Sequence, residues 1–300
     1  YRDFDEAGAA ARRRSLLTSL SEKHRDDNYA NLIPNPAIGH PFKPRAIGAG
    51  YLSWPKLPEL MPVSFPGVKT SRDDLLVDID RDRLERRIGQ YFSRNVTDEE
   101  MARVSPCSMK ATKRFDPVAT RRALFARGIH RQGVRRYSYR PFDSRWLYWD
   151  PATKLLDEKR ADYSPHVVPA NMWLITQEKP RREWSPPQIS RDIACLDLLD
   201  RGASCFPLWL LDTDSEIQGD FDEMAEHRKA SRSKFPKLWT DGVNMSPRAG
   251  EYLSSLKQGG ESALVPMHII AILHSPTYAN ENGDALRQDW PRIPLPSNAA

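Results

Sequence analysis

Proline limits regular structure in this chain more than any other residue type. Of the 300 residues 25 are proline, and eight of these lie between residues 34 and 66. Because proline fixes φ and has no amide N–H, it interrupts helices and is excluded from central strands. We therefore expect an extended, irregular connector over residues 29–66, with loops and interrupted strands in place of a helical bundle elsewhere.

Helix signals occur between the prolines. A capping box formed by Thr97 and Glu100, and Pro117 at a first helical position after Asp116, predict two helices between residues 97 and 128. Apolar residues at helical spacing, or acids ahead of arginines, predict the others. Their expected ranges are residues 5–25, 81–92, 246–257 and 266–273.

Strands are expected mainly within residues 137–149. Aromatic residues alternate there with other residues, as in half-buried strands, and a turn is expected over residues 140–143. Further strands are expected within residues 75–79, 171–177 and 205–211, and an exposed polar insertion over residues 212–234. Together these elements predict an α+β fold, a mixed-sheet domain with peripheral helices and many proline-rich loops.

Positive charge is concentrated just ahead of this aromatic stretch. From Lys110 to Arg145 there are eleven Lys or Arg residues and two acids, and the whole chain has a net charge of +5. Cations beside aromatic rings are typical of a polyanion-binding face. The alternative is that most of the rings are core residues and that Asp143 neutralises one of the arginines.

Three groups of residues resemble one known family. The first is Tyr139-Arg-Pro-Phe-Asp-Ser-Arg-Trp-Leu-Tyr-Trp149, followed by Lys154-Leu-Leu-Asp-Glu-Lys-Arg160, and the second is Gly67-Val-Lys-Thr-Ser-Arg-Asp73. The third is His274-Ser-Pro-Thr-Tyr278 with Asp289-Trp-Pro-Arg-Ile-Pro294. In this order they resemble the C-terminal target-recognition (specificity) domain of type ISP and type IIG-like single-chain restriction-modification enzymes.

The resemblance implies a module that recognises double-stranded DNA. In that family a nuclease, a helicase-like ATPase and an adenine-N6 methyltransferase precede the specificity domain. It implies that residues 1–50 are a helix and coupler from the methyltransferase domain, and that residues 51–300 are the DNA target-recognition domain. The target adenine would be positioned for methylation by domains outside this chain. S-adenosylmethionine, Mg and ATP are expected only in those domains, which are also expected partners.

Two sets of candidate site residues follow. Donors on loops and strands can contact phosphates or base edges. The expected DNA-binding residues are Lys69, Thr70, Ser71, Arg72, Arg135, Arg136, Arg140, Arg145, Lys159, Arg160, Arg181 and Arg182. The expected structural motif residues are Tyr139, Phe142, Asp143, Trp146, His274 and Tyr278.

No enzyme motif is complete in the sequence. The nearest match to an adenine methyltransferase tetrapeptide is Ser185-Pro-Pro-Gln188, which has Gln where an aromatic ring must stack on the base, and no ATP-binding phosphate loop occurs. We expect no catalytic residue and no metal site. The alternatives are a metal-dependent nuclease using Asp143, Asp157 and Lys159, a decayed methyltransferase, or a domain that mainly docks within its own polypeptide.

Cysteine spacing and hydropathy indicate the cellular compartment. The three cysteines are widely spaced and form no metal-ligand pattern, which favours a reducing environment. No segment has the length of apolar residues needed for a membrane helix, and the first residues do not form a signal peptide. We expect a bacterial cytoplasmic protein with no membrane partner. Because the chain does not begin with Met, we expect it to be part of a longer polypeptide, or a chain whose first ordered residues are not its first translated ones.

Overall fold

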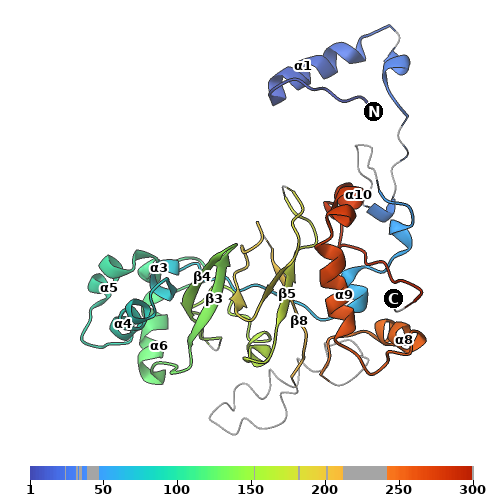
Figure 1. Cartoon of the computed structure of the whole chain (residues 1–300). Helices are drawn as coiled ribbons and strands as arrows, with labels where there is room; N and C mark the ends of the chain where they lie inside the picture. The colour runs from blue at the N-terminus through green and yellow to red at the C-terminus, as the bar shows by residue number, and fades with distance from the viewer. Residues whose placement is uncertain are drawn as a thin grey trace.

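Two four-stranded sheets lie at the centre of the molecule, with helices at both ends (Figure 1). The computed structural model describes residues 1–23, 25–31, 33, 36–38, 47–151, 153–181, 183–200, 202–211 and 242–298. These residues confirm the expected α+β class. The expected insertion at residues 212–234 lies outside the described residues.

The first sheet has the strand order β2-β4-β3-β7. Its strands are β2 (Val77–Asp78), β3 (Val134–Arg140), β4 (Asp143–Tyr148) and β7 (Ile193–Ala194). β3 and β7 are parallel, whereas the other pairs are antiparallel. The helices at this end are α3 (Asp73–Leu76), α4 (Arg81–Tyr91), α5 (Asp98–Val104) and α6 (Pro117–Arg127), with the 3-10 helix η4 (Pro106–Met109).

The second sheet is antiparallel throughout, in the order β1-β8-β5-β6. Its strands are β1 (Phe65–Pro66), β8 (Ser204–Pro207), β5 (Trp173–Thr176) and β6 (Gln188–Ser190). The helices at this end are α2 (Leu57–Leu60), α8 (Pro247–Ser255), α9 (Leu264–Leu273) and α10 (Pro276–Leu286). The remaining 3-10 helices are η1 (Arg25–Asn28), η2 (Pro36–Ile38), η3 (Tyr51–Ser53) and η5 (Ser164–His166).

The second sheet separates two hydrophobic cores. Successive side chains of a strand point to opposite faces. Trp173 and Ile175 of β5 belong to the core shared with the first sheet, whereas Leu174 packs in the core beneath α8, α9 and α10. Both faces of β5 are therefore buried. A continuous apolar strand results, in agreement with the strand expected over residues 171–177.

The predicted helix starts are confirmed at atomic detail. The side chains of Asp80, Thr97 and Asp116 accept hydrogen bonds from the backbone N–H of the third residue of α4, α5 and α6. Thr97 and Glu100 form the predicted capping box. Such caps satisfy N–H groups that have no partner inside the helix.

Three local expectations differ from the structure. Residues 75–79 do not form one strand, because Leu75 and Leu76 complete the short helix α3 and Ile79 is 72% exposed. The strand expected over residues 205–211 ends at Pro207. Helix α10 was not expected, although Ser275 caps it and Pro276 occupies its first position, the same signal as at Asp116 and Pro117.

Helix α1 (Ala9–Leu20) lies apart from the rest of the chain in Figure 1. It confirms the expected helix within residues 5–25, but Leu16, Leu17 and Leu20 are 41%, 58% and 49% exposed. Its leucines therefore do not pack on the two cores. None of the helices that the structure describes has the length and hydropathy to cross a membrane.

Candidate nucleic-acid interface

The aromatic stretch forms a β-hairpin, as predicted. Tyr137 faces Arg145 and Arg136 faces Trp146 across β3 and β4, and the register shifts between Ser138 and Arg140. Such a bulge twists the hairpin near its end. The turn follows at residues 140–143, where Phe142 has a φ of 62°.

Most of the aromatic rings of this hairpin are core residues, as the alternative interpretation held. Tyr137, Tyr148 and Trp149 are at most 4% exposed, and Tyr139 and Trp146 pack against the same core. The buried Tyr137 hydroxyl has a partner, since it donates to the Val68 carbonyl over 3.2 Å. Phe142 differs from the others because its side chain is fully exposed.

The two arginines beside the turn enclose the ring of Tyr139. The guanidinium carbons of Arg140 and Arg145 lie 4.2 and 4.0 Å from the ring centroid. Arg145 also donates to both oxygens of Asp143, and these hydrogen bonds hold the pKa of Asp143 below its ordinary value. Arg140 donates to the Cys195 sulfur over 3.1 Å. Asp143 thus neutralises one arginine only.

The loop of residues 67–73 divides into a buried half and an exposed half. Arg72 is 4% exposed, donates to the Leu155 carbonyl, and lies 3.4 Å from the centroid of the Phe115 ring. Burial lowers the pKa of Arg72. Thr70 is 3% exposed and its hydroxyl donates to Asp73. Both side chains hold the loop in place and point away from solvent.

Lys69 and Ser71 form the exposed half of this loop. The Ser71 hydroxyl donates to Asp157 over 2.9 Å, and the Lys69 ammonium lies 3.6 Å from the same carboxylate. The backbone of Lys69 also pairs with that of Glu158. The structure therefore brings together two stretches that the sequence separates by more than eighty residues.

The other predicted cations lie in different surroundings. Arg160 forms an ion pair with Glu158 and donates to the Gly67 carbonyl, whereas the backbone N–H of Arg181 donates to Asp200. Lys159 is half-buried, and its carbonyl accepts from the Trp149 indole. Arg135 is half-buried and Arg136 is exposed over the Trp146 ring. Arg182 lies outside the described residues.

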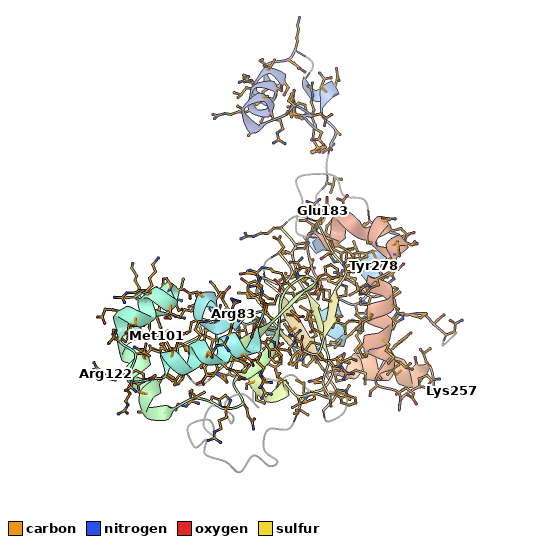
Figure 2. The ribbon with its side chains drawn as sticks, turned by 60° about the vertical axis from the view of Figure 1, so that its left-hand side comes forward. Arg83, Met101, Arg122, Glu183, Lys257 and Tyr278 are labelled. Carbon is orange, nitrogen blue, oxygen red and sulfur yellow. The ribbon has the colours of Figure 1, made fainter. Side chains whose placement is uncertain are left out.

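In the third motif, residues 274–278 contact residues 289–294. His274 ends α9 and is exposed, whereas Tyr278 is 6% exposed and donates to the Arg292 carbonyl over 2.7 Å. Burial raises the pKa of Tyr278 well above its ordinary value. Figure 2 labels Tyr278 and Glu183 at this end of the molecule, where the ring centroids of Trp184 and Tyr278 are 6.4 Å apart. Tyr278 therefore lies in the core of this end of the molecule.

The residues of the nuclease alternative have other partners. Asp143 pairs with Arg145, and Asp157 with Ser71 and Lys69. In the part of the chain that the structure describes, no group of three or more His, Cys, Asp or Glu side chains could hold a metal ion. The arrangement offers cations and rings rather than convergent carboxylates.

Two features were not anticipated from the sequence. Arg121 belongs to the basic run, but it is 2% exposed, and its guanidinium donates to the carbonyls of Tyr91 and Val96 and to Asp98. A cavity of about 630 Å³ lies beside the hairpin turn and is lined partly by Ser185-Pro-Pro-Gln188. Both depend on contacts between residues distant in sequence, so a local pattern does not reveal them.

Comparison with known proteins identifies the family. The chain matches the Type ISP C-terminal specificity domain over residues 59–300. The DrdV–DNA complex is similar in fold, with a TM-score of 0.56, 18% identity, and coverage of 78% of this chain and 21% of that chain. The ATP-dependent Type ISP restriction-modification enzyme LlaBIII bound to DNA has a TM-score of 0.60 and 16% identity, covering 90% of this chain and 17% of that chain.

The chain spans only about a fifth of the length of each of these two proteins. No curated protein matches it significantly. At these identities the two structures establish a shared fold. The family match covers 242 of the 300 residues (300 − 59 + 1), and the chain therefore belongs to the Type ISP C-terminal specificity domain family.

Proposed function

We propose that this chain is the DNA-recognition module of a longer restriction-modification enzyme. The observation that carries the proposal is the family match over residues 59–300. The two proteins of similar fold are described as complexes with DNA. In this proposal residues 1–50 are a coupler to a preceding methyltransferase domain, and residues 51–300 read the DNA.

The surface chemistry supports this proposal. Several cations of the basic run are exposed and have no carboxylate within ion-pair distance among the described residues. They are Lys110, Lys113, Arg114, Arg122, Arg131 and Arg136. Cations of this kind neutralise phosphates and release counterions. Arg140, held against Tyr139, presents a pre-oriented guanidinium group that suits a guanine edge, whereas the donors of Arg145 are engaged by Asp143.

The chemistry of the reaction belongs to other domains in this proposal. By binding the recognised sequence, this chain would position a target adenine for N6 methylation and would direct restriction. S-adenosylmethionine, Mg and ATP would be bound outside this chain, and the chain itself would not be catalytic. An intramolecular docking role is the alternative, and the exposed leucines of α1 favour a contact of that kind for residues 1–50.

The test is fluorescence anisotropy of the chain with a random-sequence duplex pool across a range of salt concentrations. A multi-phosphate contact gives a log affinity that falls steeply with log salt, with a slope near −0.9 for each phosphate neutralised. The pool is then selected to obtain the recognised sequence. Lys69→Gln and Arg136→Gln are each expected to weaken binding and to reduce the slope by about one.

Lys257→Gln is the matched control. Lys257 is exposed and follows α8, at the far end of the molecule from the hairpin (Figures 1 and 2). Its substitution removes the same charge and should leave the affinity unchanged. Equal effects of all three substitutions would show only a general charge effect. Absence of binding even at low salt would favour the docking role.

A further inference from the structure

The cavity beside the hairpin turn combines groups from both halves of the molecule. Pro141 and Phe142 come from the β3–β4 turn, Gln177 directly follows β5, Gln188 begins β6, and His274 follows α9. Its volume of about 630 Å³ lies within the range of about 300–1,000 Å³ of small-molecule sites. The lining residues therefore come from segments that are far apart in the sequence.

Phe142 is an exposed ring held in an unfavourable backbone conformation. Its side chain is fully exposed, and a φ of 62° is uncommon for a residue other than glycine, especially a bulky one. An exposed aromatic ring contributes nothing to the core, and such backbone conformations cluster at ligand-binding sites. The turn therefore presents a stacking face at the mouth of the cavity.

Gln177 contributes a buried amide side chain to the lining. It lines the cavity and is only 4% exposed, yet its Oε1 atom accepts no hydrogen bond. Buried polar atoms almost always have partners, and amide side chains pair with the edges of nucleobases. Gln188 adds another amide at the same cavity.

The charge of the lining residues indicates which part of DNA the cavity can bind. Among the residues that the structure describes, the cavity lining includes Glu183 and Asp200 but no Lys or Arg. Carboxylates repel phosphate but accept from the amino group of cytosine. Arg140 and Arg145 lie beside the turn, and the backbone N–H of Arg181 donates to Asp200. The cavity thus suits a base, and its flanks suit the backbone.

We propose that this cavity receives one unstacked nucleobase of the bound DNA, with Phe142 stacking on the base and the amide of Gln177 pairing with its edge. The inference rests on the proposed DNA-recognition function. Unstacking and unpairing a base cost free energy, and the cost is smaller for a base that is already unpaired. A duplex with one bulged nucleotide should therefore bind more tightly than the fully paired duplex.

The experiment measures anisotropy of the chain with a fully paired duplex and with the same duplex carrying one bulged 2-aminopurine. We expect about tenfold tighter binding of the bulged duplex, and a change in 2-aminopurine fluorescence when its stacking partner becomes Phe142. Phe142→Ala should abolish the preference without changing the salt slope, and Phe142→Trp should retain it. Since the ring is fully exposed, neither substitution should affect folding.

Met267→Ala is the control, because Met267 is a 61% exposed apolar side chain on α9 outside the cavity. It should leave the preference intact. Gln177→Met should reduce discrimination among duplexes with different bulged bases. If the paired duplex binds with a steep salt dependence but the bulge brings no gain, the base site is excluded and DNA recognition stands. If neither duplex binds, both proposals fail.

Discussion

The Tyr139 hydroxyl donates a 2.7 Å hydrogen bond to Asp73, and this bond joins the aromatic hairpin to the loop of residues 67–73. The ring of Tyr139 meanwhile lies against Arg140 and Arg145. Burial, followed by the bond to Asp73, raises the pKa of Tyr139. One side chain therefore fixes the position of two arginines relative to the exposed loop cation Lys69.

Tyr139→Phe should destabilise the chain by about 1 to 2 kcal/mol, because Asp73 loses a donor while the ring stays in place. The measurement is urea unfolding. Tyr252→Phe is the matched control, since the Tyr252 hydroxyl donates to the Pro296 carbonyl at an exposed position and its loss should cost less. Equal losses in the two variants would contradict a specific role for the Asp73 bond.

Arg121→Lys should cost about 2 to 4 kcal/mol of unfolding free energy. The guanidinium of Arg121 donates to Asp98 and to carbonyls of residues 90, 91, 93 and 96, and a lysine ammonium cannot reproduce this fork. The measurement is denaturant unfolding. Arg122→Lys, at an exposed position in the next residue of α6 (Figure 2), should change the stability by less than about 0.5 kcal/mol.

Local sequence signals predicted the elements whose causes are local. Asp80, Thr97 and Asp116 cap helices because each needs only the next few backbone N–H groups. The hairpin was predicted from its alternating rings and its turn. Helix α10 carried the same kind of signal at Ser275, although no helix was expected there.

The environment of individual arginines could not be predicted in this way. Arg72 is buried because Leu155 and Phe115, far along the chain, form its site, and Arg121 because the end of α4 supplies carbonyl groups. Arg136 has an equally charged side chain and is exposed. A basic run in the sequence therefore gives the charge of a region but not which of its cations reach solvent.

Acidification should destabilise the fold through His166. Burial lowers the pKa of His166 to about 4, and its Nδ1 accepts the Leu211 N–H over 3.2 Å, which requires an unprotonated nitrogen. The unfolded state takes up the proton at about pH 6.5. The contribution of unprotonated His166 to the free energy of unfolding is therefore complete above about pH 6.5 and decreases as the pH falls towards about 4. At about pH 5 about 2 kcal/mol of this contribution has been lost.

Urea unfolding at a series of pH values measures this dependence. His166→Gln removes the titrating group, and should flatten the stability profile between about pH 6.5 and 4 whatever its effect on stability at neutral pH. His274→Gln is the control because His274 is exposed. A profile of unchanged slope in His166→Gln would assign the pH dependence to other groups.

Two glycine substitutions should have opposite effects, although each adds the same methyl group. A Cβ on Gly67 would lie 2.6 Å from the backbone of Cys195 and Leu196, where the loop pairs with the strand end, so Gly67→Ala should cost about 2 to 3 kcal/mol. Gly89 lies in α4 with open space around it, so Gly89→Ala should stabilise by about 0.5 to 1 kcal/mol. Urea unfolding measures both. An unchanged free energy of unfolding in Gly67→Ala would mean that the loop moves away from Cys195 without cost.

Gly67→Ala should also weaken DNA binding, because Gly67 precedes Lys69 by two residues and the substitution displaces the same loop.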